Sequence, residues 1–227
     1  LVDNTLVVFT TDNGCSPAAG IPALIEKGHR PNAAWRGHKA DIFEGGHRVP
    51  FLVRWPGRVR AKSECSSLVS TVDFFATVAD VLGMEPQIPE TAAEDSFSFL
   101  PLLVGKPSGR RSSLVHHSIA GQFAIRRGKW KLCLCPGSGG WSAPRPKVAR
   151  KSKALPPIQL FDLDADPGER NNLQAEHPEV VAELVRELAE GIRRGRTTSG
   201  PAQANEGWPK TFIEPVLAAF PALRFKD

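Results

Sequence analysis

An uninterrupted apolar segment near the start of the chain, Thr5-Leu6-Val7-Val8-Phe9-Thr10, constrains the fold more than any other feature. It lacks the alternation of a half-exposed strand, which is typical of a strand covered on both faces in a parallel or mixed sheet. The segment stops at Thr11-Asp12-Asn13-Gly14, a turn signal. Two oxygen-bearing side chains therefore follow an interior strand, where ligand sites gather in α/β sheets.

Length and composition place the chain among globular proteins. Its 227 residues fit one large domain or two small ones, and 41% apolar with 23% charged residues is ordinary for a protein with a buried core. The apolar stretches are far shorter than the roughly 18 to 20 residues that cross a bilayer, so no membrane span is expected. Because the chain enters a strand directly after Leu1, we expect a fragment without its targeting region.

The first hundred residues predict further α/β elements. A second buried strand is expected at Phe51-Leu52-Val53-Arg54-Trp55, and residues 21–27 fit a short helix. Ser70 or Thr71 then caps a helix that ends at Gly83. We expect this helix to cover the sheet with an apolar stripe at helical spacing, made of Val72, Phe75, Ala76, Ala79 and Leu82.

The chain changes character near Gly105 and continues as short strands. Two strands, at 123–126 and 130–134, flank a hairpin connection, and another strand is expected at 158–163. Residues 178–194 predict an amphipathic helix that packs on this small antiparallel sheet. Its apolar stripe consists of Val181, Leu184, Val185, Leu188 and Ile192. The sequence therefore predicts two domains, an α/β domain at 1–105 and a sheet, helix and tail at 106–227.

Charge is unevenly placed along the chain. The net charge is +5, yet the stretch from Lys106 to Lys153 holds twelve Lys or Arg residues and no acid, which leaves −7 for the remainder. One interpretation is a solvated loop region with basic hairpin edges. The other is a rim that attracts anions, and a field of one sign suits phosphate, sulfate or nucleic acid equally.

Three residues have the chemistry of a ligand site. Asp12 and Asn13 offer hard oxygen ligands of the kind that Ca²⁺ or Mg²⁺ takes, and Gly14 lets the backbone turn so that both converge. Lys39 lies in a glycine-rich loop and could place a cation on an oxyanion. Each also has an ordinary interpretation, a capped turn for the Asp-Asn pair and a solvated side chain for the lysine.

Several motifs, in order and spacing, resemble the C-terminal half of a type I sulfatase, the arylsulfatase-like group of the alkaline phosphatase superfamily. The similarity covers most of the chain to about Arg194. The motifs are Val7-Val8-Phe9-Thr10-Thr11-Asp12-Asn13-Gly14, Arg36-Gly37-His38-Lys39-Ala40-Asp41-Ile42-Phe43-Glu44-Gly45-Gly46-His47-Arg48-Val49-Pro50, Ser70-Thr71-Val72-Asp73, Ser98-x-x-Pro101-Leu102-Leu103, Arg126-x-Gly128-Lys129-Trp130-Lys131-Leu132 and Leu160-Phe161-Asp162-Leu163-x-x-Asp166-Pro167-Gly168-Glu169-x-Asn171-Asn172-Leu173.

The resemblance implies a fold and an activity. The fold is the C-terminal part of an alkaline-phosphatase-like mixed α/β sheet with flanking helices, followed by the small antiparallel sheet and its helix. Asp12 and Asn13 would be two ligands of an active-site Ca²⁺, with Mg²⁺ the less favoured ion, and Lys39 would contact the sulfate or the leaving oxygen. A formylglycine nucleophile made from Cys or Ser then attacks sulfur, and the covalent sulfate is expelled.

The nucleophile of such enzymes lies in a Cys/Ser-x-Pro-x-Arg motif upstream of the Asp-Asn pair, and this chain does not contain it. Cys15-Ser16-Pro17-Ala18-Ala19 has alanine in place of arginine and follows the pair, so we reject it as the nucleophile. The other cysteines, Cys65, Cys133 and Cys135, lack zinc-site spacing. Ca²⁺ takes six to eight oxygens, so two recognisable ligands predict a fragment that is inactive unless completed.

Among the histidines, His29, His116 and His117 are the candidates for substrate contact, since His29 precedes Lys39 in its loop and the other two precede the first strand of the smaller domain. His38, His47 and His177 are interpreted as structural or exposed, and an ordinary surface histidine is the alternative for each candidate. The stretch Cys133-Leu134-Cys135-Pro136-Gly137-Ser138-Gly139-Gly140-Trp141 lacks the ending of a phosphate-binding P-loop and is interpreted as a loop at the pocket rim. The partner implied is a sulfated small molecule or sulfated glycan, with no nucleic acid, in an extracytoplasmic compartment.

Two alternatives stay open. A phosphodiesterase or phosphonate hydrolase of the same superfamily would share the fold, and fold alone does not choose between these activities. A non-catalytic module that binds acidic glycans or nucleic acid through the 106–153 stretch would bind with a strong dependence on salt and would not need Asp12.

Overall fold

The computed structural model describes residues 1–107 and 111–204, and these divide into two compact units of mixed α/β character. The first unit comprises Leu1–Thr10, Pro50–Leu114 and residues 190–204. The second comprises Thr11–Val49 and Val115–Ala189. Each unit takes segments from both sides of Gly105, and the division into domains 1–105 and 106–227 stays a prediction.

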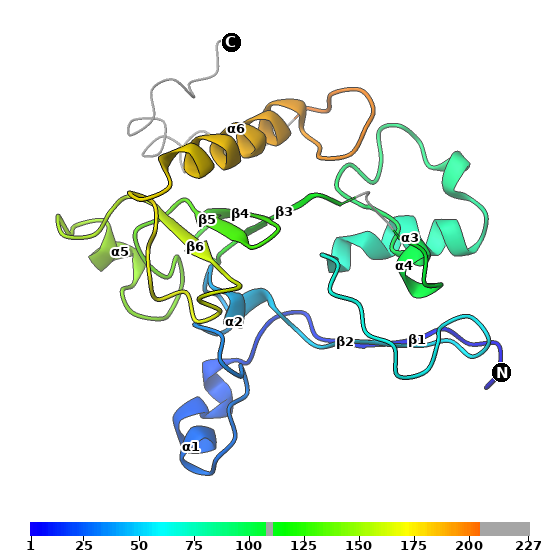
Figure 1. The fold of residues 1–227 in the computed structure, drawn as a ribbon, viewed down its shortest axis with the longest axis horizontal. Helices are drawn as coiled ribbons and strands as arrows, with labels where there is room; N and C mark the ends of the chain where they lie inside the picture. Colours follow the sequence, from blue (N-terminus) through cyan, green and yellow to red (C-terminus); the bar gives the residue numbers. More distant parts are fainter. Residues whose placement is uncertain (108–110, 205–227) are drawn as a thin grey trace. The chain divides into compact units, whose positions relative to one another are not determined.

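The first unit is built on a two-stranded antiparallel ribbon of β1 (Val7–Thr10) and β2 (Phe51–Arg54) (Figure 1). Phe51 extends from the ribbon to Phe74, the first residue of α3 (Phe74–Val81), and to Phe99, which precedes α4 (Leu100–Leu103). The three ring centroids lie 5.4 to 5.7 Å apart, in edge-to-face and tilted arrangements that favour aromatic packing. This aromatic triad fixes α3 and α4 against one face of the ribbon.

The opposite face of the ribbon is exposed, so the prediction of a strand covered on both faces is wrong for the described residues. Val7, Phe9 and Leu52 keep 47%, 59% and 63% of their surface exposed. The register explains the difference, because Val7 and Phe9 pair across from Arg54 and Leu52, on the face away from Phe51. The strand is apolar on both faces, but the described chain supplies a covering layer for only one of them.

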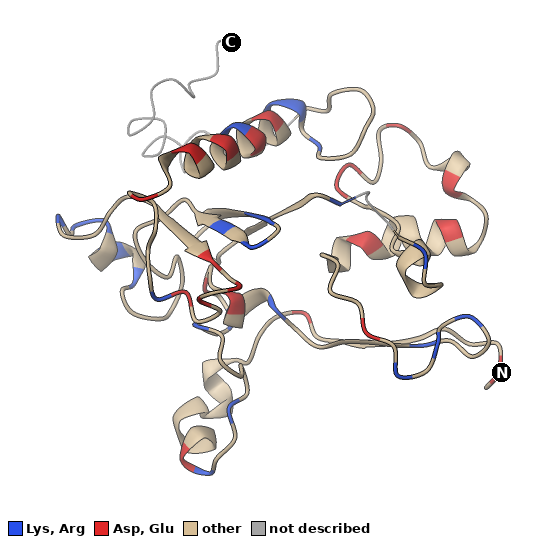
Figure 2. Cartoon of the chain, viewed as in Figure 1, with Lys and Arg blue, Asp and Glu red and all other residues tan. Residues whose placement is uncertain are grey.

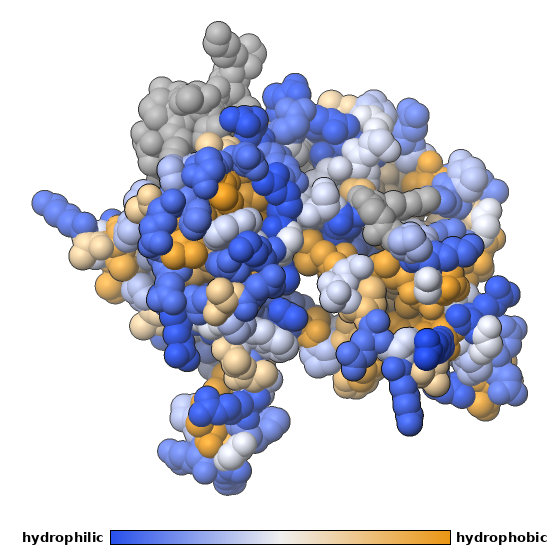
Figure 3. All heavy atoms as spheres, in the orientation of Figure 1, coloured by the Kyte–Doolittle hydropathy of each residue, from blue (hydrophilic) through white to orange (hydrophobic). Residues whose placement is uncertain are grey.

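The helix at α3 begins and ends where the sequence predicts, but it is turned differently. Ser70 and Asp73 form a capping box at the 3-10 helix Thr71–Asp73, and Gly83 follows α3 with a φ of 67°. Of the predicted apolar stripe, Val72, Phe75 and Leu82 are more than half exposed, as the hydrophobic surface around α3 in Figure 3 indicates. Ala76 is buried as predicted, and Thr77 is buried although it was not part of the stripe. Phe74, and not Phe75, enters the aromatic triad.

The second unit contains a four-stranded sheet in the order β3-β4-β5-β6. Its strands are β3 (Ser113–His117), β4 (Phe123–Arg127), β5 (Trp130–Cys133) and β6 (Gln159–Asp162), and β5 pairs antiparallel with both β4 and β6. The hairpin between β4 and β5 and the strand β6 confirm the predictions. His116 and His117 lie inside β3, and not before the first strand as the sequence suggested.

Alternation along the strands gives this sheet two different faces. On one face Ala124, Cys133 and Phe161 pack with Ile42 and Phe43 in a buried cluster. The other face is covered by α6 (Pro178–Arg194), which confirms the predicted amphipathic helix (Figure 1). Buried side chains on α6 include the predicted Val181, Leu184, Val185 and Leu188.

The second unit also contains short helices, namely the 3-10 helix Pro17–Ala19, α1 (Ile21–Glu26), α2 (Glu44–His47) and α5 (Pro146–Ala149). The helix α1 confirms the short helix predicted for 21–27. The first unit has a further 3-10 helix, Glu85–Gln87.

The part of the chain that the structure describes has no helix long and apolar enough to cross a membrane.

All four cysteines are unpaired, and their environments predict different reactivities. Cys65 is exposed, whereas burial raises the pKa of Cys133 well above its usual value and that of Cys135 to about 12. Because the thiolate is the reactive form, we expect an alkylating reagent at neutral pH to modify Cys65 in the native protein and Cys133 and Cys135 only after unfolding. Peptide mapping by mass spectrometry checks this, and rapid native labelling of Cys133 would contradict it.

Candidate functional site

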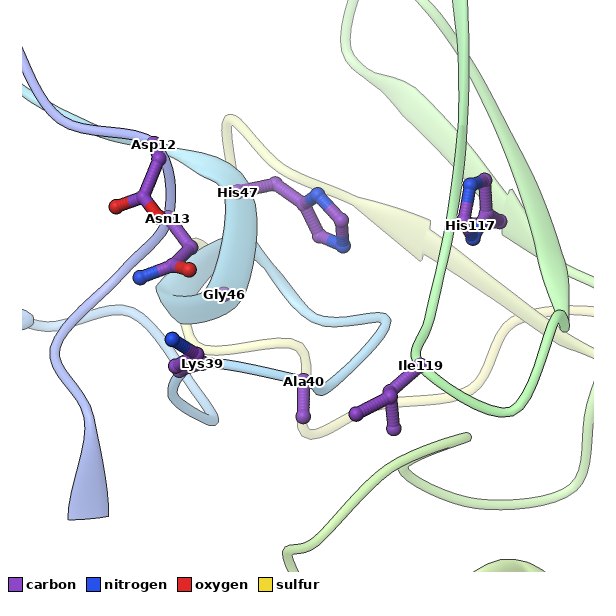
Figure 4. Close-up of a pocket in the computed structure, with 8 residues that line it drawn as sticks. All are labelled: Asp12, Asn13, Lys39, Ala40, Gly46, His47, His117 and Ile119. Carbon is purple, nitrogen blue, oxygen red and sulfur yellow. The ribbon is translucent and has the colours of Figure 1, made fainter. Parts of the chain in front are cut away.

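A pocket of about 240 Å³ lies in the second unit (Figure 4). Asp12, Asn13 and Lys39 lie on one side of it, and the rings of His47 and His117 lie toward the other. Its lining consists of Asp12, Asn13, Lys39, Ala40, Gly46, His47, His117 and Ile119. Segments that are far apart in the sequence therefore meet here: the turn after β1, the 39–47 loop and the end of β3.

The Asp-Asn turn is held by its backbone against α2. The Gly14 amide donates to the Gly46 carbonyl at 3.0 Å, and Gly14 is buried. A Cβ atom at Gly14 would lie 1.7 Å from the Gly45 carbonyl oxygen, so only glycine permits this close approach. The Asn13 amide nitrogen donates to the Gly14 carbonyl at 3.1 Å, which leaves its side-chain oxygen available to a ligand beside the exposed Asp12 carboxylate.

Lys39 is positioned by both neighbouring segments. Its amide donates to the Cys15 carbonyl at 3.0 Å, directly after the Asp-Asn turn. Ala40 follows with a φ of 84°, a strained conformation for a residue with a side chain, and its carbonyl accepts from the Ile119 amide at 3.0 Å. The Lys39 ammonium makes no ion pair with any carboxylate of the described residues, and it lines the pocket together with Asp12.

The buried carboxylate of Asp41 stabilises the loop that carries Lys39. Asp41 accepts from the His38 amide at 3.0 Å and from the amides of Trp141 and Ser142 at 2.8 and 2.9 Å. The Ser142 hydroxyl also contacts Asp41 and lies 3.1 Å from His38 Nε2. The loop around Trp141 is thus attached to the segment that carries Lys39, but none of its residues lines the pocket, so its place at the pocket rim stays a prediction.

A buried charge network lies under α2. Lys131 on β5 is fully buried, and its Nζ lies 3.0 Å from Glu44 Oε1 and 2.9 Å from Glu169 Oε1. The other Glu169 oxygen accepts from the Glu44 amide at 2.6 Å, which fixes the first residue of α2. Arg126 adds a second cation, 3.1 Å from Glu44. Charge-assisted bonds therefore join β5, the loop at Glu169 and the helix that carries Gly46 and His47.

These groups set one another's protonation. Burial alone would lower the pKa of Lys131, but the carboxylates of Glu44 and Glu169 outweigh it and raise the pKa. Burial alone would raise the pKa of Glu44, but the positive charges of Lys131 and Arg126 outweigh burial, so the pKa of Glu44 is lowered. Burial raises the pKa of Glu169, whose carboxylate has Lys131 as its only ion-pair partner among the described residues, while Arg36 donates to the Glu169 main-chain carbonyl at 2.7 Å. Lys131 is therefore charged at every physiological pH.

His47 and His116 form a contact pair at the inner side of the pocket. Their ring centroids lie 4.2 Å apart, and His116 Nε2 lies 3.2 Å from the Ile42 carbonyl. Burial and the nearby Lys131 charge lower the pKa of His47 to about 4 and that of His116 well below its usual value. Both rings are neutral at pH 7, so His47 gives the pocket a polar wall without adding charge.

Four of the six residues chosen from the sequence line the pocket, namely Asp12, Asn13, Lys39 and His117. His116 contacts the His47 ring and does not line the pocket. His29 is exposed in the loop after α1, with its amide bonded to the Leu24 carbonyl, and does not line this pocket. Its role stays a prediction. His47 was missed because one histidine beside a Gly-Gly pair has no periodicity or spacing that marks it, although its place in the Lys39 loop was a usable signal.

The donor set suits Ca²⁺ in kind but is small in number. Asp12 and Asn13 supply the hard oxygens that this ion takes. No group of three or more His, Cys, Asp or Glu residues able to hold a metal occurs within residues 1–107 and 111–204. Asp12 and Asn13 by themselves supply fewer oxygens than the six to eight that Ca²⁺ takes.

The chain is similar in sequence to known sulfatases. The family model described as Sulfatase matches residues 1–84. An N-acetylgalactosamine-6-O-sulfatase of Bacteroides thetaiotaomicron is 38% identical over 199 residues, covering 85% of this chain and 37% of that protein. Arylsulfatase A of Bos taurus is 33% identical over 223 residues, covering 91% of this chain and 42% of that protein.

A solved structure agrees with these matches. It comes from Bacteroides thetaiotaomicron and is described under the metabolism of multiple glycosaminoglycans. The TM-score is 0.69 at 35% identity, covering 84% of this chain and 39% of that one. The chain thus spans about two fifths of the length of the proteins it matches, and its mixed α/β structure corresponds to that part of their fold.

Proposed function

Because this chain belongs to the sulfatase family, we propose that it is the C-terminal part of a Ca²⁺-dependent enzyme that hydrolyses sulfate esters. The observation that carries the proposal is the pocket. Residues chosen from the sequence as metal ligands, cation and substrate contact line a single hollow of about 240 Å³, although they are up to 105 positions apart in the chain. If Asp12 and Asn13 only capped a turn and Lys39 were only a solvated side chain, these residues would have no reason to line the same pocket.

The proposed roles follow from chemistry and position. Asp12 and Asn13 would hold part of the Ca²⁺ coordination, and the ion would neutralise charge on the sulfate oxygens. Lys39, unpaired with any described carboxylate, would bind a sulfate oxygen or the ester oxygen on which charge develops. His117, with Nδ1 at 2.9 Å from the Ser118 carbonyl, would contact the alcohol part of the substrate. The formylglycine nucleophile would come from a region outside this chain.

A chimeric enzyme tests this proposal. In it, this chain replaces the matching part of the Bacteroides N-acetylgalactosamine-6-O-sulfatase, which supplies the remainder of the fold. We expect hydrolysis of N-acetylgalactosamine 6-sulfate, and loss of about a thousandfold or more in kcat/KM for Asp12→Ala or Lys39→Ala, because each removes charge stabilisation from the reacting group. Removal of Ca²⁺ by a chelator should abolish turnover.

The matched control is Asp3→Ala, since Asp3 is an exposed aspartate that does not line the pocket. It should leave kcat/KM unchanged. A folded chimera whose activity survives Asp12→Ala would overturn the proposed metal role. Faster turnover of an aryl phosphodiester than of an aryl sulfate would instead favour the phosphodiesterase alternative.

A further inference from the structure

Ten of the twelve cations in the basic stretch from Lys106 to Lys153 fall into two groups once carboxylate partners are considered. Five of its cations are used by the fold, and each forms an ion pair with an acid from elsewhere in the chain. They are Arg111 with Asp73, Arg126 and Lys131 with Glu44, Arg127 with Glu183, and Lys129 with Asp162. Ion pairs within the fold therefore account for these five positive charges without a ligand.

The cations at 145–153, here named the basic segment, are different. Arg145, Lys147, Arg150, Lys151 and Lys153 are all exposed, and none forms an ion pair with a described residue. No acid occurs in the sequence from residue 96 to 161, and Figure 2 shows the positive charges grouped on and after α5. Five like charges within nine residues repel one another, so the folded chain gains nothing from this arrangement.

The basic segment packs against the loop at 138–142, here named the pocket loop because it is bonded to the segment that carries Lys39. Ala149 of α5 is buried, and the Gly137 backbone passes so close that an added Cβ would lie 2.9 Å from the Ala149 side chain. The loop from Ser138 to Ser142 is bonded to Asp41, two residues after Lys39, and the Ile42 amide donates to the Ser138 carbonyl at 2.7 Å. The charges therefore follow a loop that is bonded to Asp41 and Ile42, directly after the pocket-lining residues Lys39 and Ala40.

The pocket loop itself carries an exposed aromatic side chain, Trp141. Trp141 is 40% exposed, its amide is bonded to Asp41, and its carbonyl accepts from Arg145 Nε at 3.0 Å. Trp141 therefore offers an exposed apolar ring for a sugar, and Arg145, whose guanidinium is bonded to the main-chain carbonyl of Trp141, offers a cation for the charges that the sugar carries.

We propose that Trp141 and the basic segment bind a sulfated glycan chain beyond the sulfate ester held in the pocket, so that this protein takes polyanionic oligosaccharides and not only single sulfated sugars. The choice of a glycan over other polyanions rests on the proposed sulfatase function. The binding itself depends only on the charges, the indole and their attachment to the pocket loop.

Binding of the isolated chain to a chondroitin sulfate decasaccharide tests this surface. A triple variant, Lys147→Gln, Lys151→Gln and Lys153→Gln, should weaken binding about tenfold or more and reduce its dependence on salt, because three exposed ionic contacts are lost. The matched control neutralises three exposed cations of the first unit, Arg58→Gln, Arg60→Gln and Lys62→Gln. It removes the same net charge and should leave the affinity within about twofold. Trp141→Ala should also weaken glycan binding.

Three results would overturn the proposal. Equal losses in both triple variants would mean that net charge alone attracts the glycan. Equal affinity for N-acetylgalactosamine 6-sulfate and the decasaccharide would mean that no chain is bound beyond the pocket. Tighter binding of a single-stranded oligonucleotide of equal charge, with the same loss in the triple variant, would identify a nucleic-acid surface. These assays need no turnover, so an inactive chimera would contradict the proposed function and leave the binding result intact.

Discussion

Replacing Lys131 by methionine should lower the free energy of unfolding by about 3 to 5 kcal/mol, the usual cost of removing one partner from a buried ion pair. Methionine matches the length of the lysine side chain, so the packing around β5 changes little. The loss comes from Glu44 and Glu169, whose side chains are 5% and 0% exposed. Glu44 keeps Arg126, but Glu169 keeps only the Glu44 amide.

Urea unfolding followed by circular dichroism measures this effect, with Lys129→Met as the matched control. Lys129 precedes β5 and lies 2.7 Å from Asp162, yet its side chain is 46% exposed. An exposed ion pair of this kind contributes about 0 to 1 kcal/mol. Similar losses for Lys131→Met and Lys129→Met would contradict the importance of burial.

A double variant separates the lost ion pair from lost packing. Glu169→Gln removes the second buried charge but keeps an oxygen for the Glu44 amide, so Lys131→Met with Glu169→Gln should be less destabilised than the sum of the two single variants by about 1 to 3 kcal/mol. Burial raises the pKa of Glu169 in the folded protein, so folding favours its protonated form. Stability of Lys131→Met should therefore fall as pH rises above the unfolded pKa of glutamate.

The elements predicted well from the sequence are those whose pattern repeats within one element. The helix α6 has its apolar positions at a spacing of three and four residues, and its bounds agree with the prediction. The hairpin at Gly128 is likewise defined by a short connection between two apolar strands. In both cases the information lies within about twenty consecutive residues.

Features that depend on distant partners were not predictable in this way. The apolar faces of β1 and α3 indicate burial, but whether a layer covers them depends on other segments. Lys131 and Glu169 both belong to recognised motifs, yet nothing in their spacing along the chain shows that their side chains form a buried ion pair. The Asp12 and Lys39 pocket was predictable only because the order of the motifs supplied the long-range information that composition and periodicity lack.

Gly14→Ala should disrupt the pocket, since the added methyl group has no space. Its position is 1.7 Å from the Gly45 carbonyl oxygen, 2.8 Å from the Gly45 carbonyl carbon and 3.2 Å from Gly46 Cα. All three are backbone atoms of the buried turn α2, so no side chain can rotate out of the way. The turn after β1 must move away, which breaks the bond from Gly14 to Gly46 and shifts Asp12 and Asn13 relative to Lys39.

A displacement of about 1 Å at a reacting centre can cost on the order of a hundredfold in rate, so Gly14→Ala in the chimera should lose at least that much kcat/KM. The free energy of unfolding should fall by about 1 to 3 kcal/mol because of overpacking. Gly191→Ala is the control, since Gly191 lies in α6 with Thr197 Cγ2 at an ordinary 3.5 Å, and alanine should add up to about 1 kcal/mol of helix stability there. Wild-type activity and stability in Gly14→Ala would show that the turn is not held against α2 and would remove the geometric basis of the pocket.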